Sequence, residues 1–147
     1  MKIAKNKELK FSQKPPVGNK GANIFLVDDL RSFKPRILAG LEDDSYVRVC
    51  RTSKSAIETL ESEDRHWDQF WFDHDLGIVD GVKDTTMAVV NYLIERHQQG
   101  RPLKVTNYII HSSNGPGVRN IAMALNSMDK DSVIVNAQDF FFVVEKS

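Results

Sequence analysis

Short apolar runs alternate along this chain with longer segments in which apolar residues recur every three or four positions. The apolar runs, which are typical of strands in a parallel sheet, occupy residues 24–27, 45–50, 69–72, 107–111 and 133–135. The segments between them predict helices, because their apolar residues fall on one side of a helix. Strands that alternate with helices favour a doubly wound α/β fold, with five parallel strands in the order 2-1-3-4-5 and both faces of the sheet covered.

Helix starts are indicated by residues that cap helices well. Ser32 is placed to cap the first helix, with Pro35 in its first turn, and Ser53 is placed to cap the second. A loop is expected at 77–81, after which Asp84 is placed to cap the third helix. Near the C-terminus, the run DFFFVVEK predicts an extra strand rather than a fifth helix.

Composition and charge add limits but no function. The chain of 147 residues, 41% hydrophobic and 27% charged, is ordinary for a globular protein, which excludes disordered and collagen-like classes. Residues 1–22 carry six lysines and one glutamate, so we expect a basic N-terminal arm followed by one domain over 23–147. No apolar run is long enough to span a bilayer and no signal core is present, so a cytoplasmic protein without membrane contact is expected.

Polar residues gather where three of the predicted strands end. They are Asp28 and Asp29 after the first strand, Asp73, His74 and Asp75 after the third, and His111, Ser112, Ser113 and Asn114 after the fourth. Ligands of doubly wound sheets bind beyond the carboxyl ends of the strands, and these three strands are expected to be neighbours. The sequence therefore predicts one polar site at this edge of the sheet.

Asp28, Asp29 and Asp73 are candidate metal ligands. Carboxylates that share a cleft repel one another, and a hard divalent ion such as Mg²⁺ or Mn²⁺ relieves that repulsion. Zinc is disfavoured, because the thiolate and paired-histidine spacings of zinc sites are missing. The alternative is that an aspartate at a strand end only caps the next helix.

The other polar residues favour a phosphate ligand. The candidate phosphate-binding residues are Arg31, Ser112, Ser113, Asn114 and Gly115, the last four at the start of a predicted helix. The ring of His111 is expected to overhang the cleft and to titrate near neutrality, which suits general acid or base work. His74 either reacts or only orients an aspartate. The candidate catalytic residues are Asp73, His111, Asp75 and His74.

Three motifs in order, VDDLR, FDHDLG and HSSN followed by glycine, resemble the receiver-like family called the cyclic-phosphate processing receiver domain, which is common in phage and bacterial genomes. The resemblance covers roughly residues 23–127. It implies that Asp28, Asp29 and Asp73 form an acidic Mg²⁺-binding pocket, and that cyclic phosphates such as RNA ends are opened or hydrolysed. A signalling receiver has a lysine after its fifth strand, whereas this chain has VIVNAQD, with Asn136 and Gln138 there.

The leading hypothesis is a metal-dependent phosphoesterase that acts on a cyclic or terminal phosphate of a nucleotide or an RNA end. The alternative from another class is an inactive receiver-like binding module, phage-encoded, that docks on a host or partner protein. A third interpretation, a phosphoacceptor at Asp73, is weakened by the missing lysine.

Overall fold

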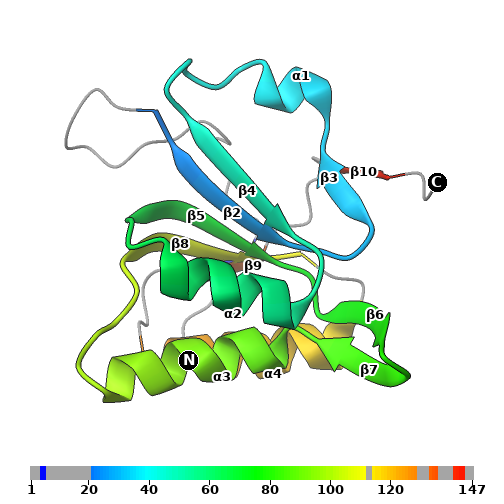
Figure 1. The fold of residues 1–147 in the computed structure, drawn as a ribbon, viewed down its shortest axis with the longest axis vertical. Helices are drawn as coiled ribbons and strands as arrows, with labels where there is room; N and C mark the ends of the chain where they lie inside the picture. The colour runs from blue at the N-terminus through cyan, green and yellow to red at the C-terminus, as the bar shows by residue number, and fades with distance from the viewer. Residues whose placement is uncertain (1–3, 6–20, 112–113, 129–132, 136–140, 145–147) are drawn as a thin grey trace.

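A parallel sheet forms the centre of the protein in the computed structural model, which describes residues 4–5, 21–111, 114–128, 133–135 and 141–144 (Figure 1). Its strands are β1 (Ala4–Lys5), β2 (Asn23–Val27), β4 (Tyr46–Cys50), β5 (Trp67–Phe72), β8 (Val105–Ile110) and β9 (Val133–Val135). Their order is β1-β9-β8-β5-β2-β4, and every neighbouring pair is parallel. The mixed α/β class with a parallel central sheet is thus confirmed. The described part of the sheet has six strands, and the additional one comes from the predicted N-terminal arm.

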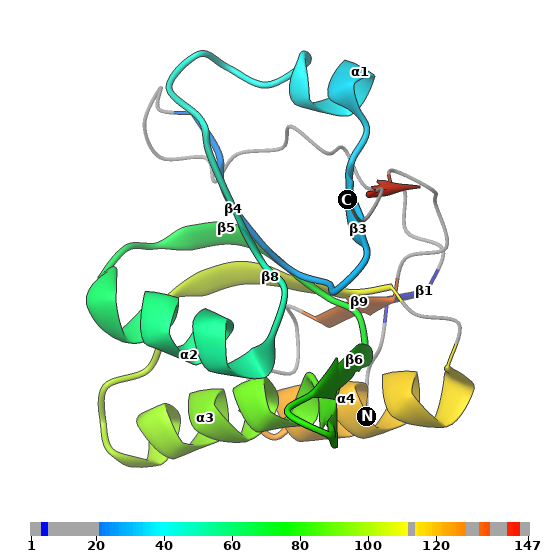
Figure 2. The same cartoon turned by 45° about the vertical axis from the view of Figure 1, so that its right-hand side comes forward.

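Three helices cover one face of the sheet. They are α2 (Ser53–Ser62), α3 (Met87–Gln98) and α4 (Gly115–Asn126), and both views place them side by side below the strands (Figures 1 and 2). Their buried apolar residues form one core with the strand residues that point toward them, among them Phe25, Phe70 and Phe72. The one-sided apolar spacing of these segments accounts for this packing.

The opposite face is covered mainly by strands. β3 (Arg31–Phe33) pairs antiparallel with β10 (Phe141–Val143), and the short helix α1 (Pro35–Leu38) follows β3. The rings of Phe33 and Phe141 stack 4.8 Å apart, and both meet Trp71 edge-on at 5.5 Å. A second core lies here, separate from the core under the helices.

The expected first helix is therefore wrong in its start and its length. Ser32 does not cap a helix, because it lies in β3 and is paired with Phe142. The helix that follows has four residues and begins at Pro35, after Lys34 as its N-cap. The cause is the pairing of β3 with a segment near the C-terminus. The extra C-terminal strand is confirmed by β10.

The other caps also differ from the expectation. Thr52, not Ser53, caps α2, since its hydroxyl oxygen accepts a hydrogen bond from the backbone N–H of Ser55 at 3.1 Å. Asp84 does not cap α3, whose N-cap is Thr86. The carboxylate of Asp84 instead accepts hydrogen bonds from the N–H and the hydroxyl of Ser53, at 2.9 and 2.6 Å. Asp84 thus provides a hydrogen-bond acceptor for a free backbone N–H group at the start of the preceding helix, α2.

A β-hairpin stands where a loop was expected at 77–81. Its strands are β6 (Asp75–Val79) and β7 (Val82–Thr85), which pair antiparallel. Asp80 and Gly81 form the turn with φ of 52° and 77°, and two positive φ values are what a two-residue type I′ turn requires. The hairpin projects from the carboxyl end of β5 (Figure 2).

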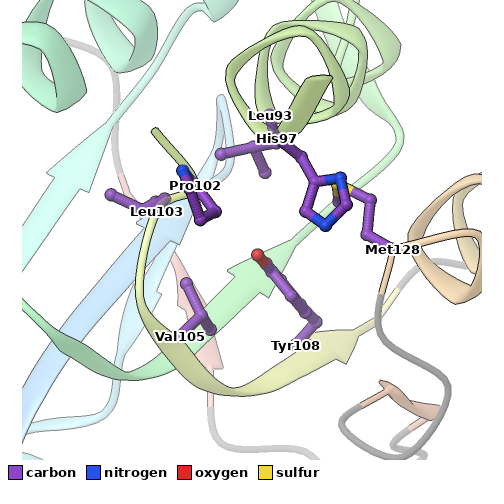
Figure 3. A pocket seen from close by; sticks show the side chains of 7 residues that line it. All are labelled: Leu93, His97, Pro102, Leu103, Val105, Tyr108 and Met128. Atoms are coloured by element: carbon purple, nitrogen blue, oxygen red, sulfur yellow. The ribbon is translucent and has the colours of Figure 1, made fainter. Parts of the chain in front are cut away.

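Figure 3 shows a pocket away from the strand ends that carry the aspartates. Leu93 and His97 of α3 face Val105 and Tyr108 of β8 across it, and Met128 lies at its side. None of the described helices is long and apolar enough to cross a membrane.

Candidate functional site

Three carboxylates meet at the carboxyl ends of β2 and β5. Asp28 and Asp29 follow β2, and Asp73 follows β5, its neighbour in the sheet. The backbone N–H of Asp73 donates to the carbonyl of Val27 at 3.0 Å, which continues the ladder and fixes the two strand ends side by side. One oxygen of each carboxylate lies within 4.8 Å of the others. Parallel register thus gathers the three predicted metal ligands at one point.

Asp28 is the buried member of this acidic group. It is 0% exposed, and its Oδ1 accepts hydrogen bonds from the backbone N–H groups of Leu30 and Arg31 at 2.9 and 2.8 Å. Its Oδ2 has no hydrogen-bond partner among the described residues. Burial raises the pKa of Asp28, while the two N–H groups and the charge of Arg31 act against that rise. A buried carboxylate oxygen without a donor, beside two other carboxylates, fits a cation.

His111 lies against Asp28, and aromatic rings bury its side chain. Its Nε2 is 3.6 Å from Oδ2 of Asp28, too far for a hydrogen bond, and also has no hydrogen-bond partner among the described residues. The ring stacks on Phe141 at 4.1 Å and meets Trp71 edge-on at 6.0 Å. Burial, and after it the charge of Arg31, lower the pKa of His111 to about 3.

The expectation that the ring of His111 overhangs an open cleft and titrates near neutrality is therefore wrong. The side chain is 6% exposed and stays neutral at pH 7, because the fold buries it without a hydrogen-bonded acid. The neutral, buried imidazole packs against Asp28 without a hydrogen bond to it and is not exposed to donate a proton to a ligand.

A second polar cluster lies beside the acidic group. Nδ1 of His74 is 3.1 Å from Oδ1 of Asp75, and the side-chain amide of Asn114 donates to Oδ2 of Asp75 at 3.2 Å. The backbone N–H of His74 donates to Oδ1 of Asp73 at 2.9 Å, which links the two groups. The hydrogen bond from Asn114 is the main reason that the pKa of Asp75 is lowered, and His74 contributes in the same direction.

The start of α4 is tied into this cluster. Asn114 is the N-cap of α4, and its Oδ1 accepts a hydrogen bond from the N–H of Gly117 at 3.0 Å. The ring of His74 lies directly over Gly117, where a β-carbon would be 2.5 Å from Cγ of His74. Gly115 is exposed in the same turn. The predicted phosphate-binding residues Ser112 and Ser113 lie outside the described residues, as do Asn136 and Gln138.

Two residues that the sequence analysis does not single out lie against the loop that carries Asp28 and Asp29. Arg51, which follows β4, donates to the carbonyl oxygens of Asp28 and Arg31 at 3.1 and 2.5 Å and to the hydroxyl of Ser32 at 2.6 Å. Gly77 has φ of 78°, and a β-carbon there would lie 3.0 Å from Oδ2 of Asp29. Arg51 also follows a parallel strand, so the strand-end rule that found the aspartates would have found it.

A parallel α/β sheet with acidic residues after two adjacent strands defines the class of this protein as receiver-like. The model of the cyclic-phosphate processing receiver domain family matches residues 23–127, which is most of the chain. The chain therefore belongs to this family, as its motifs indicated.

Two further comparisons add no functional information. No curated protein matches the chain significantly. A solved structure described as yeast Spc42 trimeric coiled-coil amino acids 181–211 fused to another structure is similar, with a TM-score of 0.44 and 15% identity over 80% of this chain and 67% of that chain. A similarity this low carries no argument about fold or function.

Proposed function

We propose that this protein is a metal-dependent phosphoesterase that acts on a cyclic or terminal phosphate of a nucleotide or an RNA end. The observation that carries the proposal is the buried Oδ2 of Asp28, which has no hydrogen-bond partner among the described residues and belongs to the group of three carboxylates. The family to which the chain belongs supports the phosphate class of the substrate.

In this proposal Asp28, Asp29 and Asp73 hold Mg²⁺ or Mn²⁺. Carboxylate oxygens at the ends of two adjacent strands suit such an ion better than zinc, which prefers nitrogen and sulfur. A bound divalent ion would polarise a phosphoryl oxygen and lower the pKa of a coordinated water. Arg51 supports the site by fixing the loop that carries Asp28.

The remaining side chains then act on the phosphate and on protons. Asp75 is ionised and hydrogen-bonded to Asn114, so the pair of Asp75 and His74 is the proton-handling group that remains partly accessible. The charge of Arg31 acts on both Asp28 and His111, and Arg31 remains a candidate phosphate ligand. His111 limits the access of solvent to Asp28 in this proposal, and Ser112 with Ser113 remain candidate phosphate ligands.

The test is hydrolysis of 2′,3′-cyclic nucleotides, RNA with a cyclic phosphate end, and cyclic dinucleotides, each with Mg²⁺, Mn²⁺ or EDTA. Asp73→Asn keeps the shape of the side chain and removes its charge, and Asp64→Asn is the matched control, because Asp64 is exposed and outside the acidic group. We expect turnover that needs the metal, is lost in Asp73→Asn and is kept in Asp64→Asn.

Calorimetric titration with Mg²⁺ and Mn²⁺ separates metal binding from turnover. Metal binding that depends on Asp73 without turnover of any substrate would refute the enzyme and favour a receiver-like binding module for a partner protein. Turnover that continues in EDTA would refute the role of the metal.

A further inference from the structure

The hairpin beside the acidic group presents an apolar side chain and a lysine on the same face. Ile78 of β6 pairs directly with Lys83 of β7, and side chains of directly paired residues point to the same side of an antiparallel ladder. Ile78 is 77% exposed. A single exposed isoleucine needs no explanation, so its position relative to the site decides whether it has a role.

Ile78 and Lys83 line a hollow that adjoins the candidate site. Its other lining residues are Asp75, Gly77 and Asn114, and its volume is ≈ 360 Å³. Asp75 and Asn114 belong to the hydrogen-bonded cluster that is linked to Asp73 through His74. The hollow thus shares Asn114, a candidate phosphate ligand, with the candidate site.

The walls of the hollow differ in chemistry. Ile78 offers an apolar surface, while Nζ of Lys83 lies 3.9 Å from Oδ1 of Asp75 and the Lys83 side chain is 74% exposed. Gly77 contributes only backbone to the wall, since the position of its missing β-carbon faces Asp29. The volume falls in the range of about 300–1,000 Å³ that is usual for small-molecule sites and exceeds what a lone phosphate needs.

We propose that the β6–β7 hairpin binds the nucleoside part of the substrate, with the base against Ile78 and the ammonium group of Lys83 directed at a phosphate oxygen. This inference rests on the proposed function, because it names the organic part of the same substrate. Ile78 and Lys83 are specificity-determining residues in it and take no part in bond breaking. The substrate class is then a phosphate ester that carries a nucleobase, rather than a phosphate ester of any small alcohol.

The experiment compares 2′,3′-cyclic AMP with glycerol 1,2-cyclic phosphate, which lacks a base. Binding of each is measured by isothermal titration to the Asp73→Asn protein, so that turnover does not interfere, and kcat/KM is measured in the parent protein. Ile78→Ser removes the apolar surface. The matched control is Met123→Ser, because Met123 is an apolar residue on α4 that is 61% exposed and lies outside the hollow.

We expect Ile78→Ser to weaken binding of 2′,3′-cyclic AMP by about tenfold, the order of magnitude that losing a small apolar contact gives. Binding of the base-free probe should change by less than about twofold, since it makes no contact with Ile78. Lys83→Met should weaken binding of 2′,3′-cyclic AMP and reduce its dependence on salt concentration. Met123→Ser should match the parent protein with both probes.

The outcomes separate this inference from the proposed function. Binding of 2′,3′-cyclic AMP that depends on Ile78, without turnover in the parent protein, would support the hairpin subsite and refute the phosphoesterase. Metal-dependent turnover of both probes with equal kcat/KM in the parent and in Ile78→Ser would support the phosphoesterase and overturn the subsite. No binding of 2′,3′-cyclic AMP to the Asp73→Asn protein, with or without Ile78→Ser, would also overturn the subsite.

Discussion

Replacing Gly117 by alanine tests whether the contact between α4 and His74 holds the site together. The added β-carbon would lie 2.5, 2.6 and 2.9 Å from Cγ, Cδ2 and Nδ1 of His74. Cγ is close to the root of the side chain, so the whole ring has to move. That movement breaks the contact of Nδ1 with Asp75, which is 3.1 Å away in the native protein.

The expected magnitude follows from two opposing effects. Overpacking of this kind costs about 1–3 kcal/mol, and the lost hydrogen bond adds on the order of 1 kcal/mol. Alanine gains at most about 1 kcal/mol over glycine from helix propensity. The steric cost prevails, and we expect the free energy of unfolding to fall by about 1–3 kcal/mol, which lowers the Tm by roughly 2–12 °C for a domain of this size.

Gly115→Ala is the matched control in the same helical turn. The nearest atom that its β-carbon would meet is Nη1 of Arg119 at 4.0 Å, so only the propensity gain remains. Urea denaturation of both variants, and of Gly117→Ala combined with His74→Ala, measures the contact directly. Equal stability of Gly117→Ala and Gly115→Ala would refute the reasoning, and so would an unchanged penalty after the His74 ring is removed.

Three further predictions concern the buried side of the site. The pKa of His111 is about 3 in the folded protein, against 6.5 for an ordinary histidine, so unfolding takes up a proton between these pH values. The free energy of unfolding should therefore fall with decreasing pH by up to about 1.4 kcal/mol per pH unit. Denaturation in EDTA at several pH values should show a shallower pH dependence for His111→Phe than for the parent protein. Identical slopes for the two proteins would contradict this. Phe141→Ala should lower the free energy of unfolding by about 3–5 kcal/mol and raise the pKa of His111 toward its ordinary value, which NMR titration measures. An unchanged pKa would show that burial by Phe141 is not the cause of the low pKa. Arg51→Met should lower the free energy of unfolding by about 1–3 kcal/mol in urea denaturation and weaken Mg²⁺ binding. Arg119→Met, an exposed substitution on α4, should do neither. Equal effects of the two substitutions would show that Arg51 does not fix the loop.

The central strands and the acidic group were predictable because both depend on short sequence segments. The run FWF in β5 is buried on both sides of the sheet, and such strands read as continuous apolar runs. Strand ends that share a sheet edge bring Asp28 and Asp73 together whatever the details of the loops. The roles of these residues in metal binding and catalysis remain predictions.

The hairpin was missed although its signal was present. Asp80-Gly81 between the apolar residues Val79 and Val82 is a strong two-residue hairpin signal, whereas the glycines at 77 and 81 indicate only a loop. The first helix was wrong for a different reason. Nothing near Ser32 shows that it pairs with Phe142, because the partner strand lies at the other end of the chain.

The same remoteness explains the environment of His111. A histidine at a strand end is open to solvent unless something covers it, and the cover comes from Phe141 in β10. The sequence around residue 111 does not predict the contact with Phe141. Its low pKa is thus a property of tertiary structure, which spacing and composition do not reveal.

The location of Phe141 also sets an order of events during synthesis. Chains emerge from the ribosome with the N-terminal part first, so the strands that carry Asp28, Asp29 and Asp73 are available long before β10. Until β10 is available, Trp71 and His111 lack their ring contacts with Phe141. The ring contact that buries His111 therefore depends on a part of the chain that is synthesised after all three carboxylates.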